Sequence, residues 1–166
     1  MNDTADYWIK TLNLQPHPEG GYFREVYRSE EQITELPSRY EGPRNFATSI
    51  YFLLTGKDKS AFHRIASDET WHFYSGCPLI LYTLDVRSGL QKVMLGNNPT
   101  EGQTLQYTIP HGTWFGGHPV DEKSYSLLGC TVAPGFEFTD FELGEYEKLS
   151  GNFPGHRDMI RKLCIQ

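Results

Sequence analysis

The chain has 166 residues, of which 38% are hydrophobic and 14% aromatic, and its formal net charge is −6 at pH 7. A chain of this length can bury a hydrophobic core without disulfides or a structural metal, so we expect one domain over residues 1–166. The 15 Lys and Arg residues are scattered along the sequence, which argues against nucleic acid as a partner.

The N-terminal segment MNDTADYWIK has neither the basic nor the apolar region of a signal peptide, and no apolar run approaches the ~20 residues of a membrane span. The three cysteines, Cys77, Cys130 and Cys164, are far apart and lack the C-x-x-C spacing of a thiolate zinc site. Their number and spacing also do not resemble a disulfide framework. We therefore expect a cytoplasmic protein that has no membrane partner.

The first half of the chain begins with a short helix and continues as strands. Residues 4–14 show helical spacing behind a possible cap at Asp3 or Thr4, and Pro16 ends the pattern. Residues 21–29 alternate as a strand does, residues 30–44 read as a polar loop, and residues 47–54 form the next strand. Residues 79–86 and 90–95 form a hairpin around a turn in which Gly89 supplies a positive φ.

Strand patterns continue to residue 143 and then give way to helices. Residues 105–110, 124–132 and 136–143 read as strands, and residues 110–117 read as a turn. Residues 145–149 and 156–163 carry helix formers, with Gly151 as a helix stop between them. Many short antiparallel strands predict an all-β sandwich or barrel with short helices at both ends.

The most informative segment runs from Ser60 to Gly76, and a second begins at Pro110. Their spacing resembles the two cupin motifs, G-x5-H-x-H-x3-4-E-x6-G and P-x-G-x2-H. His63 and Glu69 fall in register with the first motif. Because residues two apart on a strand share a face, such side chains can converge on one site inside a barrel.

Two of the four metal-ligand positions of the cupin motifs are occupied by side chains that cannot coordinate a metal, Ile65 and Phe115. We therefore expect no metal and no cofactor. An alternative set, in which His72 joins His63 and Glu69, would supply two histidines and a carboxylate. Strand parity places His72 on the face opposite Glu69, and only a bulge would bring it inward.

Four sequence blocks resemble the DUF985 (cupin_5) family more specifically. They are HPEGGYFRE, AFHR with the DETWHFY segment that follows it, PHGTWFG, and YSLLGCTVAPGF, and together they span most of the chain. The resemblance implies a cupin double-stranded β-helix, also called a jelly-roll barrel, that usually forms a homodimer. It also implies a pocket comparable to those of the metal-free sugar-nucleotide epimerases of the RmlC type.

For a metal-free pocket, the resemblance and the residues together indicate proton transfer on a small polar, sugar-like or sugar-nucleotide-like ligand. His63 and Glu69 are the candidate catalytic pair of an epimerase or isomerase. Tyrosines are candidate opposing proton donors, arginines could bind an anionic group, and aromatic rings could contact a sugar or heterocycle. These candidate ligand-binding residues are Tyr22, Tyr51, Tyr125, Arg24, Arg64, Trp71, Phe73, Trp114 and Phe115.

The sequence leaves open whether the protein is an enzyme, because each candidate residue also has a structural interpretation. A ligand-binding or sensing module without turnover fits the same residues, as does an atypical metal-dependent cupin. His63 and Glu69 could be a satisfied buried pair, and the aromatic residues could be core. Arg24 and Arg28 could face solvent or a partner subunit, and we interpret the segment from His17 to Gly21 as a tight structural turn into the first strand.

Overall fold

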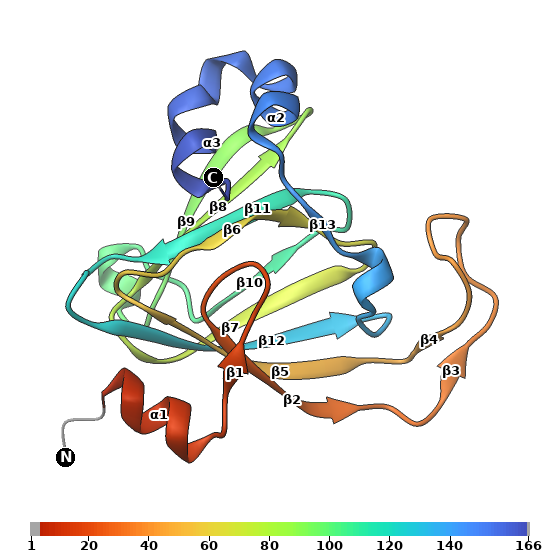
Figure 1. The fold of residues 1–166 in the computed structure, drawn as a ribbon, viewed down its shortest axis with the longest axis horizontal. Helices are drawn as coiled ribbons and strands as arrows, with labels where there is room; N and C mark the ends of the chain where they lie inside the picture. Colours follow the sequence, from red (N-terminus) through yellow and green to blue (C-terminus); the bar gives the residue numbers. More distant parts are fainter. Residues whose placement is uncertain (1–3, 166) are drawn as a thin grey trace.

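The computed structural model describes residues 4–165 and consists mainly of two β-sheets packed face to face (Figure 1). One sheet has the order β1-β2-β5-β12-β7-β10, and the other has the order β13-β6-β11-β8-β9. The strands of the first are β1 (Gln15–Pro16), β2 (Tyr22–Arg28), β5 (Thr48–Thr55), β12 (Tyr125–Ala133), β7 (Asp68–Gly76) and β10 (Gln106–Ile109). Those of the second are β13 (Glu142–Leu143), β6 (Ser60–Arg64), β11 (Trp114–Pro119), β8 (Leu79–Asp85) and β9 (Gly89–Leu95). This arrangement confirms the predicted jelly-roll barrel.

The helices are short and lie at the two ends of the chain, as predicted. Helix α1 (Ala5–Thr11) begins at Thr4, whose hydroxyl accepts a hydrogen bond from the Tyr7 backbone N–H at 3.2 Å. Helices α2 (Tyr146–Asn152) and α3 (Arg157–Leu163) pack together over the five-stranded sheet (Figure 1). Gly151 does not stop α2, which runs on to Asn152 because the backbone N–H of Phe153 still bonds to the Leu149 carbonyl at 2.8 Å.

Two sequence predictions about loops and strands need correction. The segment 30–44 is not wholly a loop, because β3 (Gln32–Ile33) pairs with β4 (Arg44–Asn45). Residues 136–143 do not form one strand: they contain a 3₁₀ turn, η2 (Phe138–Asp140), and only the short β13. Further 3₁₀ turns are η1 (Pro99–Glu101) and η3 (Pro154–His156).

The hairpin between β8 and β9 forms as predicted, with Gly89 at φ +66°. The predicted turn at residues 110–117 is shorter than expected, because β11 begins at Trp114. It begins there because the backbone of Trp114 already pairs with Leu84 of β8. A glycine-rich stretch can therefore still form a strand when neighbouring strands supply the backbone hydrogen bonds.

Buried hydrophobic side chains form three clusters at different places in the fold. The largest lies between the sheets and includes Phe52, Trp71 and Phe115. A second packs α2 and α3 against the outer side of the five-stranded sheet, and a third lies under α1. None of the helices in the described residues is long and apolar enough to span a membrane.

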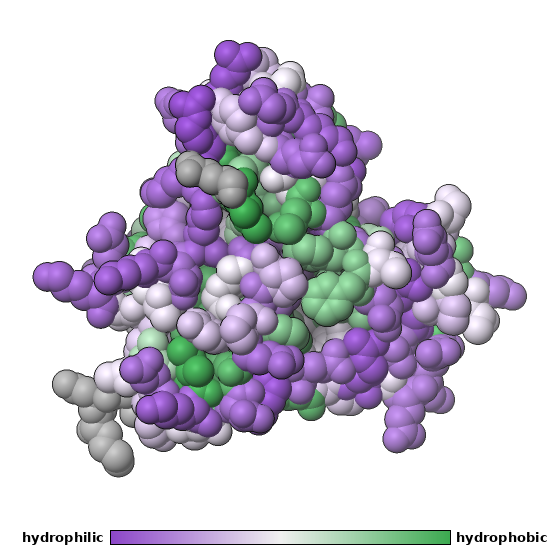
Figure 2. All heavy atoms as spheres, in the orientation of Figure 1, coloured by the Kyte–Doolittle hydropathy of each residue, from purple (hydrophilic) through white to green (hydrophobic). Residues whose placement is uncertain are grey.

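Figure 2 shows that hydrophilic side chains cover most of one face of the molecule, while apolar side chains gather in its middle. Segment 136–141, which links β12 to β13, contributes an exposed phenylalanine, Phe138. This segment borders the pocket that lies between the sheets.

Candidate functional site

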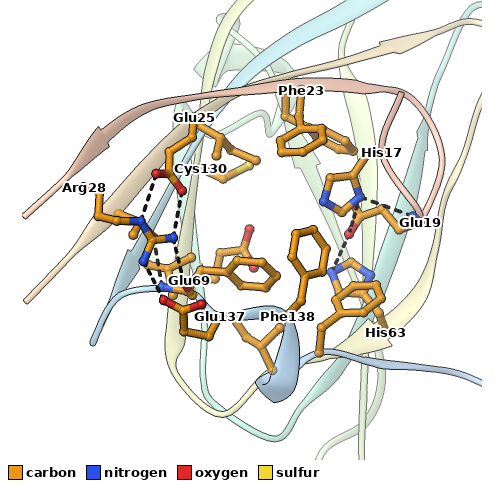
Figure 3. A pocket seen from close by; sticks show the side chains of 17 residues that line it. His17, Glu19, Phe23, Glu25, Arg28, His63, Glu69, Cys130, Glu137 and Phe138 are labelled. Atoms are coloured by element: carbon orange, nitrogen blue, oxygen red, sulfur yellow. Dashed lines mark hydrogen bonds and ion pairs between the residues drawn. The ribbon is translucent and has the colours of Figure 1, made fainter. Parts of the chain in front are cut away.

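One end of the barrel contains a pocket of about 80 Å³ (Figure 3). A buried water needs ~10–15 Å³ by the same kind of measure, so the pocket has room for a small molecule. Its lining combines acidic, histidine and phenylalanine side chains. These are His17, Glu19, Glu25, His63, Glu69, Glu137, Phe23, Phe52, Phe136, Phe138 and Phe141, and they are joined by Arg28, Thr48, Ile50, Ile65, Cys130 and Val132.

His63 reaches the pocket from β6, on which alternate residues point inward. Its Nδ1 lies 2.8 Å from the Ala61 carbonyl oxygen, which can only accept a hydrogen bond, so Nδ1 carries a proton. In the neutral ring, Nε2 is therefore an acceptor. The ring is buried against Phe115, with 4.0 Å between ring centroids, and burial lowers the pKa of His63 to about 3. His63 is thus an uncharged imidazole at neutral pH.

Glu19 provides the partner of His63. Its Oε2 lies 3.1 Å from His63 Nε2, and the Ser60 hydroxyl donates to its Oε1 at 2.6 Å. Burial, and next the negative charge of Glu69, raise the pKa of Glu19 well above its usual value. Since His63 Nε2 is an acceptor, a protonated Glu19 donates to it, and both groups are uncharged.

Two glycines allow the turn that brings Glu19 into the pocket. Gly20 has φ +114° and Gly21 has φ +72°, values that side chains disfavour. A Cβ on Gly20 would also lie 2.0 Å from the carbonyl oxygen of Lys59. The predicted structural role of these glycines is therefore confirmed, but the turn also places two side chains that line the pocket.

The second of those side chains is His17. The backbone N–H of Glu19 donates to His17 Nδ1 at 3.2 Å, so the proton of the neutral ring lies on Nε2. Figure 3 shows the ring of His17 directed into the pocket. Burial lowers the pKa of His17 to about 4, so the ring is an uncharged hydrogen-bond donor at neutral pH.

Glu69 lies on β7 and lines the same pocket from another wall. The Trp71 indole N–H donates to its Oε1 at 2.8 Å, and the Cys130 thiol also bonds to the carboxylate. These two bonds favour the ionised form, but burial disfavours it more and raises the pKa of Glu69 to about 7. Glu69 can therefore accept or release a proton near neutral pH.

Arg28 lies at the opposite side of the pocket from the histidines (Figure 3). Its guanidinium bonds to Glu25 through Nε and one terminal nitrogen, each at 2.9 Å, and to Glu137 at 2.7 Å. It also donates to Asn45 Oδ1 at 2.9 Å and to the Phe136 carbonyl at 3.0 Å. Arg28 thereby links β2 to segment 136–141 across the pocket.

A β-bulge explains why Arg28 faces the pocket. The register of β2 against β5 shifts between Glu25 and Tyr27. Strict alternation would put Phe23, Glu25 and Tyr27 on one face, but the extra residue puts Arg28 there in place of Tyr27. Arg24 and Arg28 would share one face of a regular strand, but the bulge places them on opposite faces of β2.

The structure brings His63 and Glu69 into one pocket, as the sequence predicted, although the close partner of His63 is Glu19. The other nine candidates do not line this pocket. The rings of Trp71, Phe73 and Phe115 fill the barrel interior next to it, and the indole of Trp71 contacts Glu69. Their proposed direct ligand contacts stay predictions.

The six remaining candidates point away from the barrel interior, because each occupies a strand position whose side chain faces outward. Tyr22, Tyr51 and Tyr125 belong to the cluster under α1. Arg24 stacks on Tyr51, with its guanidinium carbon 5.9 Å from the ring centroid. Arg64 and Trp114 lie on the other sheet, where the guanidinium carbon is 4.5 Å from the ring centroid. Arg64 also pairs with Glu142.

His72 lies on the outward face of β7, as parity predicted. Glu69, Trp71 and Phe73 are buried, whereas His72 is partly exposed and contacts Thr131 Oγ1 at 3.3 Å. The two-histidine, one-carboxylate set of His63, Glu69 and His72 is therefore not brought together.

The donor set of the pocket does not fit the transition-metal site of metal-dependent cupins. Ile65 and Phe115 share the inward face with His63 but offer no lone pair. The lone pair of His63 Nε2 is occupied by Glu19, and Glu69 accepts from Trp71. Among residues 4–165, no group of three or more His, Cys, Asp or Glu side chains is placed to hold a metal ion.

Sequence reasoning missed five charged or histidine residues of the pocket: His17, Glu19, Glu25, Arg28 and Glu137. The block HPEGGYFRE contained three of them, His17, Glu19 and Glu25, but a turn with two glycines gives no sign of which side chains point inward. Glu137 was assigned to a strand that does not form. A histidine and a glutamate immediately before a Gly-Gly pair are the sequence signal that could have indicated His17 and Glu19.

Comparisons with known proteins agree with this fold. The sequence matches the family described as "Cupin superfamily (DUF985)" over residues 6–144. A hypothetical protein from Leishmania major is 36% identical with a TM-score of 0.90, and the match covers 99% of this chain and 100% of that one. A crystal structure of a protein from Shewanella oneidensis is 39% identical with a TM-score of 0.88, and 98% of each chain is covered.

More distant structures share the fold alone. Oxalate decarboxylase from Bacillus subtilis is 17% identical with a TM-score of 0.54, and the match covers 89% of this chain but only 36% of the decarboxylase. No curated protein matches the sequence. The family match spans the strands that build the pocket, and the chain belongs to the DUF985 family of the cupin superfamily.

Proposed function

We propose that this cupin binds a small polar molecule in the pocket and moves a proton on it, as an epimerase or isomerase does. The observation that supports this proposal most strongly is Glu69, a buried carboxyl group whose pKa is raised to about 7. A general base or acid works best when its pKa is near the operating pH. Most structural carboxylates on a protein surface lack this property.

The neutral histidine side of the pocket suits the other half of such a reaction. When the Glu69 carboxylate removes a proton from a carbon next to a carbonyl group, negative charge develops on the carbonyl oxygen. The Nε2–H of His17 can donate a hydrogen bond to that oxygen. Protonated Glu69 then returns the proton to the ligand, so that the reaction is a redox-neutral isomerisation.

His63 has a positioning role in this scheme. Its unprotonated ring nitrogen, Nε2, accepts a hydrogen bond from Glu19. The same carboxyl oxygen of Glu19, Oε2, lies 3.6 Å from His17 Nδ1. His63 therefore holds the turn from His17 to Gly21 against β6. Its role as a catalytic base stays a prediction, and a direct role would require Glu19 to release Nε2.

The experiment that tests the proposal is proton exchange in D₂O. Small aldoses, ketoses and other α-hydroxy carbonyl compounds are incubated with the protein, and NMR follows the loss of the carbon-bound proton. We expect exchange that accelerates as the pH rises through about 7 and that falls by at least ~100-fold in Glu69→Gln. Tyr22→Phe, a change under α1, is the matched control. Full exchange activity in Glu69→Gln would contradict the proposal.

A ligand-binding module without turnover is a second candidate, and one observation favours it. The polar groups on the His63 side satisfy one another, because Ser60, Glu19 and His63 form a continuous chain of hydrogen bonds. A site that only binds needs no free base there. A compound that binds in the pocket but shows no proton exchange would support this candidate over the first.

A further inference from the structure

We infer that the pocket selects a small organic cation, such as a protonated amine, and rejects anions such as carboxylates and phosphates. This inference deepens the proposed function, on which it rests, by naming the charge class of the molecule that occupies the same pocket. It departs from a sugar-nucleotide ligand, whose phosphates would need cationic partners. It follows from the bonding of Arg28, the acidic groups and the aromatic walls.

Arg28 is the only Lys or Arg side chain among the described residues that line the pocket. A guanidinium has five N–H groups. All five are used: two bond to Glu25, one to Glu137, one to Asn45 and one to the Phe136 carbonyl. An anionic ligand would have to break one of these bonds, so Arg28 does not act as an anion receptor.

The second observation is the excess of acidic groups around the pocket. Glu25 and Glu137 share the single positive charge of Arg28, which leaves one negative charge at the mouth. Inside, Glu69 is buried and accepts hydrogen bonds from neutral donors only, Trp71 and Cys130. A buried carboxylate without a cationic partner is costly, and an ammonium group of a ligand would supply that partner.

The third observation is the aromatic wall between the two polar ends. Phe23, Phe52, Phe136, Phe138 and Phe141 all line the pocket. The faces of such rings attract cations. Rings near carboxylates are a common arrangement for binding ammonium groups, whereas an anion is repelled by ring faces.

The histidines do not reverse this charge balance. Both rings are uncharged at neutral pH for the reason given above, and the Nε2–H of His17 is directed into the pocket. A ligand that uses both ends would therefore carry a hydrogen-bond acceptor toward His17 and a positive nitrogen toward Glu69. A small amino ketone meets both conditions and also carries the carbonyl group that the proposed reaction needs.

The inference is tested with probes that share a carbon skeleton and differ in the charge of their polar group. Benzylamine, benzyl alcohol and benzoate are titrated into the full chain near neutral pH, and binding is followed by isothermal calorimetry and by NMR. Isobutylamine, isobutanol and isobutyrate form a smaller series that removes ligand size as a cause of weak binding. We expect each amine to bind at least ~10-fold more tightly than its alcohol, and each carboxylate to bind more weakly than the alcohol.

Variants then assign the preference to the pocket. Glu69→Gln keeps an acceptor for Trp71 and should reduce amine affinity at least ~5-fold while changing alcohol affinity by less than ~2-fold. Phe138→Ala, a change at an exposed rim position, should also weaken amine binding more than alcohol binding. Glu30→Gln, at an exposed position, should change neither.

The outcomes separate this inference from the proposed function. If the carboxylates bind best, or the amine preference survives in Glu69→Gln, the charge inference is wrong although the pocket still binds small molecules. If the alcohols bind as well as the amines, the inference is also wrong. If none of the six probes binds at millimolar concentration, both the inference and the proposed ligand site are contradicted.

Discussion

At the scale of single residues, the pocket is defined by carboxyl groups in unusual protonation states. Glu19 and Glu69 are both buried, but their partners differ. Glu19 donates to a neutral histidine, whereas Glu69 only accepts hydrogen bonds. The same side-chain type therefore serves as a fixed donor in one position and as a titrating group in the other.

The state of Glu69 predicts a pH-dependent stability. Because its pKa is about 7 in the folded protein and 4.5 in a model peptide, the folded protein binds more protons between these values. Its contribution to stability is complete below about pH 4.5 and is lost as the pH rises through about 7. Glu69→Gln removes this loss, so we expect equal stability of the two proteins at the acidic limit and an advantage of up to ~3 kcal/mol for Glu69→Gln above pH 7.

Urea unfolding of both proteins at a series of pH values measures this difference. Glu30→Gln, at an exposed position, should give a constant difference across the same range. A Glu69→Gln advantage that is as large at pH 4.5 as at pH 8 would show that the change acts through packing and not through ionisation.

The residue scale also shows what the sequence could indicate. The motif spacing located His63 and Glu69 in one pocket because strand parity is a reliable constraint on a regular strand. It could not locate Arg28, since the bulge in β2 is invisible in the sequence, and it could not orient Glu19 in an irregular turn. Tyr22, Tyr51 and Tyr125 have the chemistry of proton donors, but their positions on the strands direct their side chains toward α1.

At the scale of elements, segment 136–141 is held in place by ion pairs and not by a strand ladder. Arg44 bonds to both carboxylate oxygens of Asp140, at 2.7 and 2.5 Å, and only 3% and 5% of these side chains are exposed. Arg28 and Glu137 fix the other end of the segment. A pattern of alternating phenylalanines suggested a strand, but these rings instead line the pocket from a turn.

The buried pair predicts a large loss when one partner is removed. Arg44→Ala leaves Asp140 buried without its partner, so we expect a loss of about 3–5 kcal/mol in the free energy of unfolding. Lys148→Ala removes an exposed pair with Glu142 and should cost less than ~1 kcal/mol. Denaturant unfolding measures both, and equal effects of the two changes would contradict a structural role of the Arg44 pair.

At the scale of the whole molecule, the hydrophobic clusters lie in separate regions of the fold, and the cluster under the C-terminal helices is separate from the pocket. The cluster under α2 and α3 contains Leu149, Ile160 and Leu163, and it lies on the outer side of the five-stranded sheet. The pocket lies on the inner side. The sequence predicted this architecture well because four motif blocks span most of the chain and each implies a strand of the same barrel.

This separation predicts that stability can be lost without loss of the site. Ile160→Ala should lower the free energy of unfolding by about 2–4 kcal/mol, because the side chain is fully buried. Binding of the amine probes in the folded protein should change by less than ~2-fold. Thermal unfolding and calorimetry measure the two effects, and a loss of both together would show that the helices support the pocket directly. The homodimer expected from the family stays a prediction.

The hydrogen bond between Trp71 and Glu69 has a practical consequence. An indole whose N–H contacts a carboxyl group changes its emission when that group gains or loses charge, and Trp71 is buried beside the pocket. The contribution of Trp71 to the intrinsic fluorescence, obtained by comparison with Trp71→Phe because Trp8 and Trp114 also emit, should therefore follow the ionisation of Glu69 with a midpoint near pH 7. A cation held at Glu69 would shift that midpoint downward, so the unlabelled protein carries its own optical sensor of pocket occupancy.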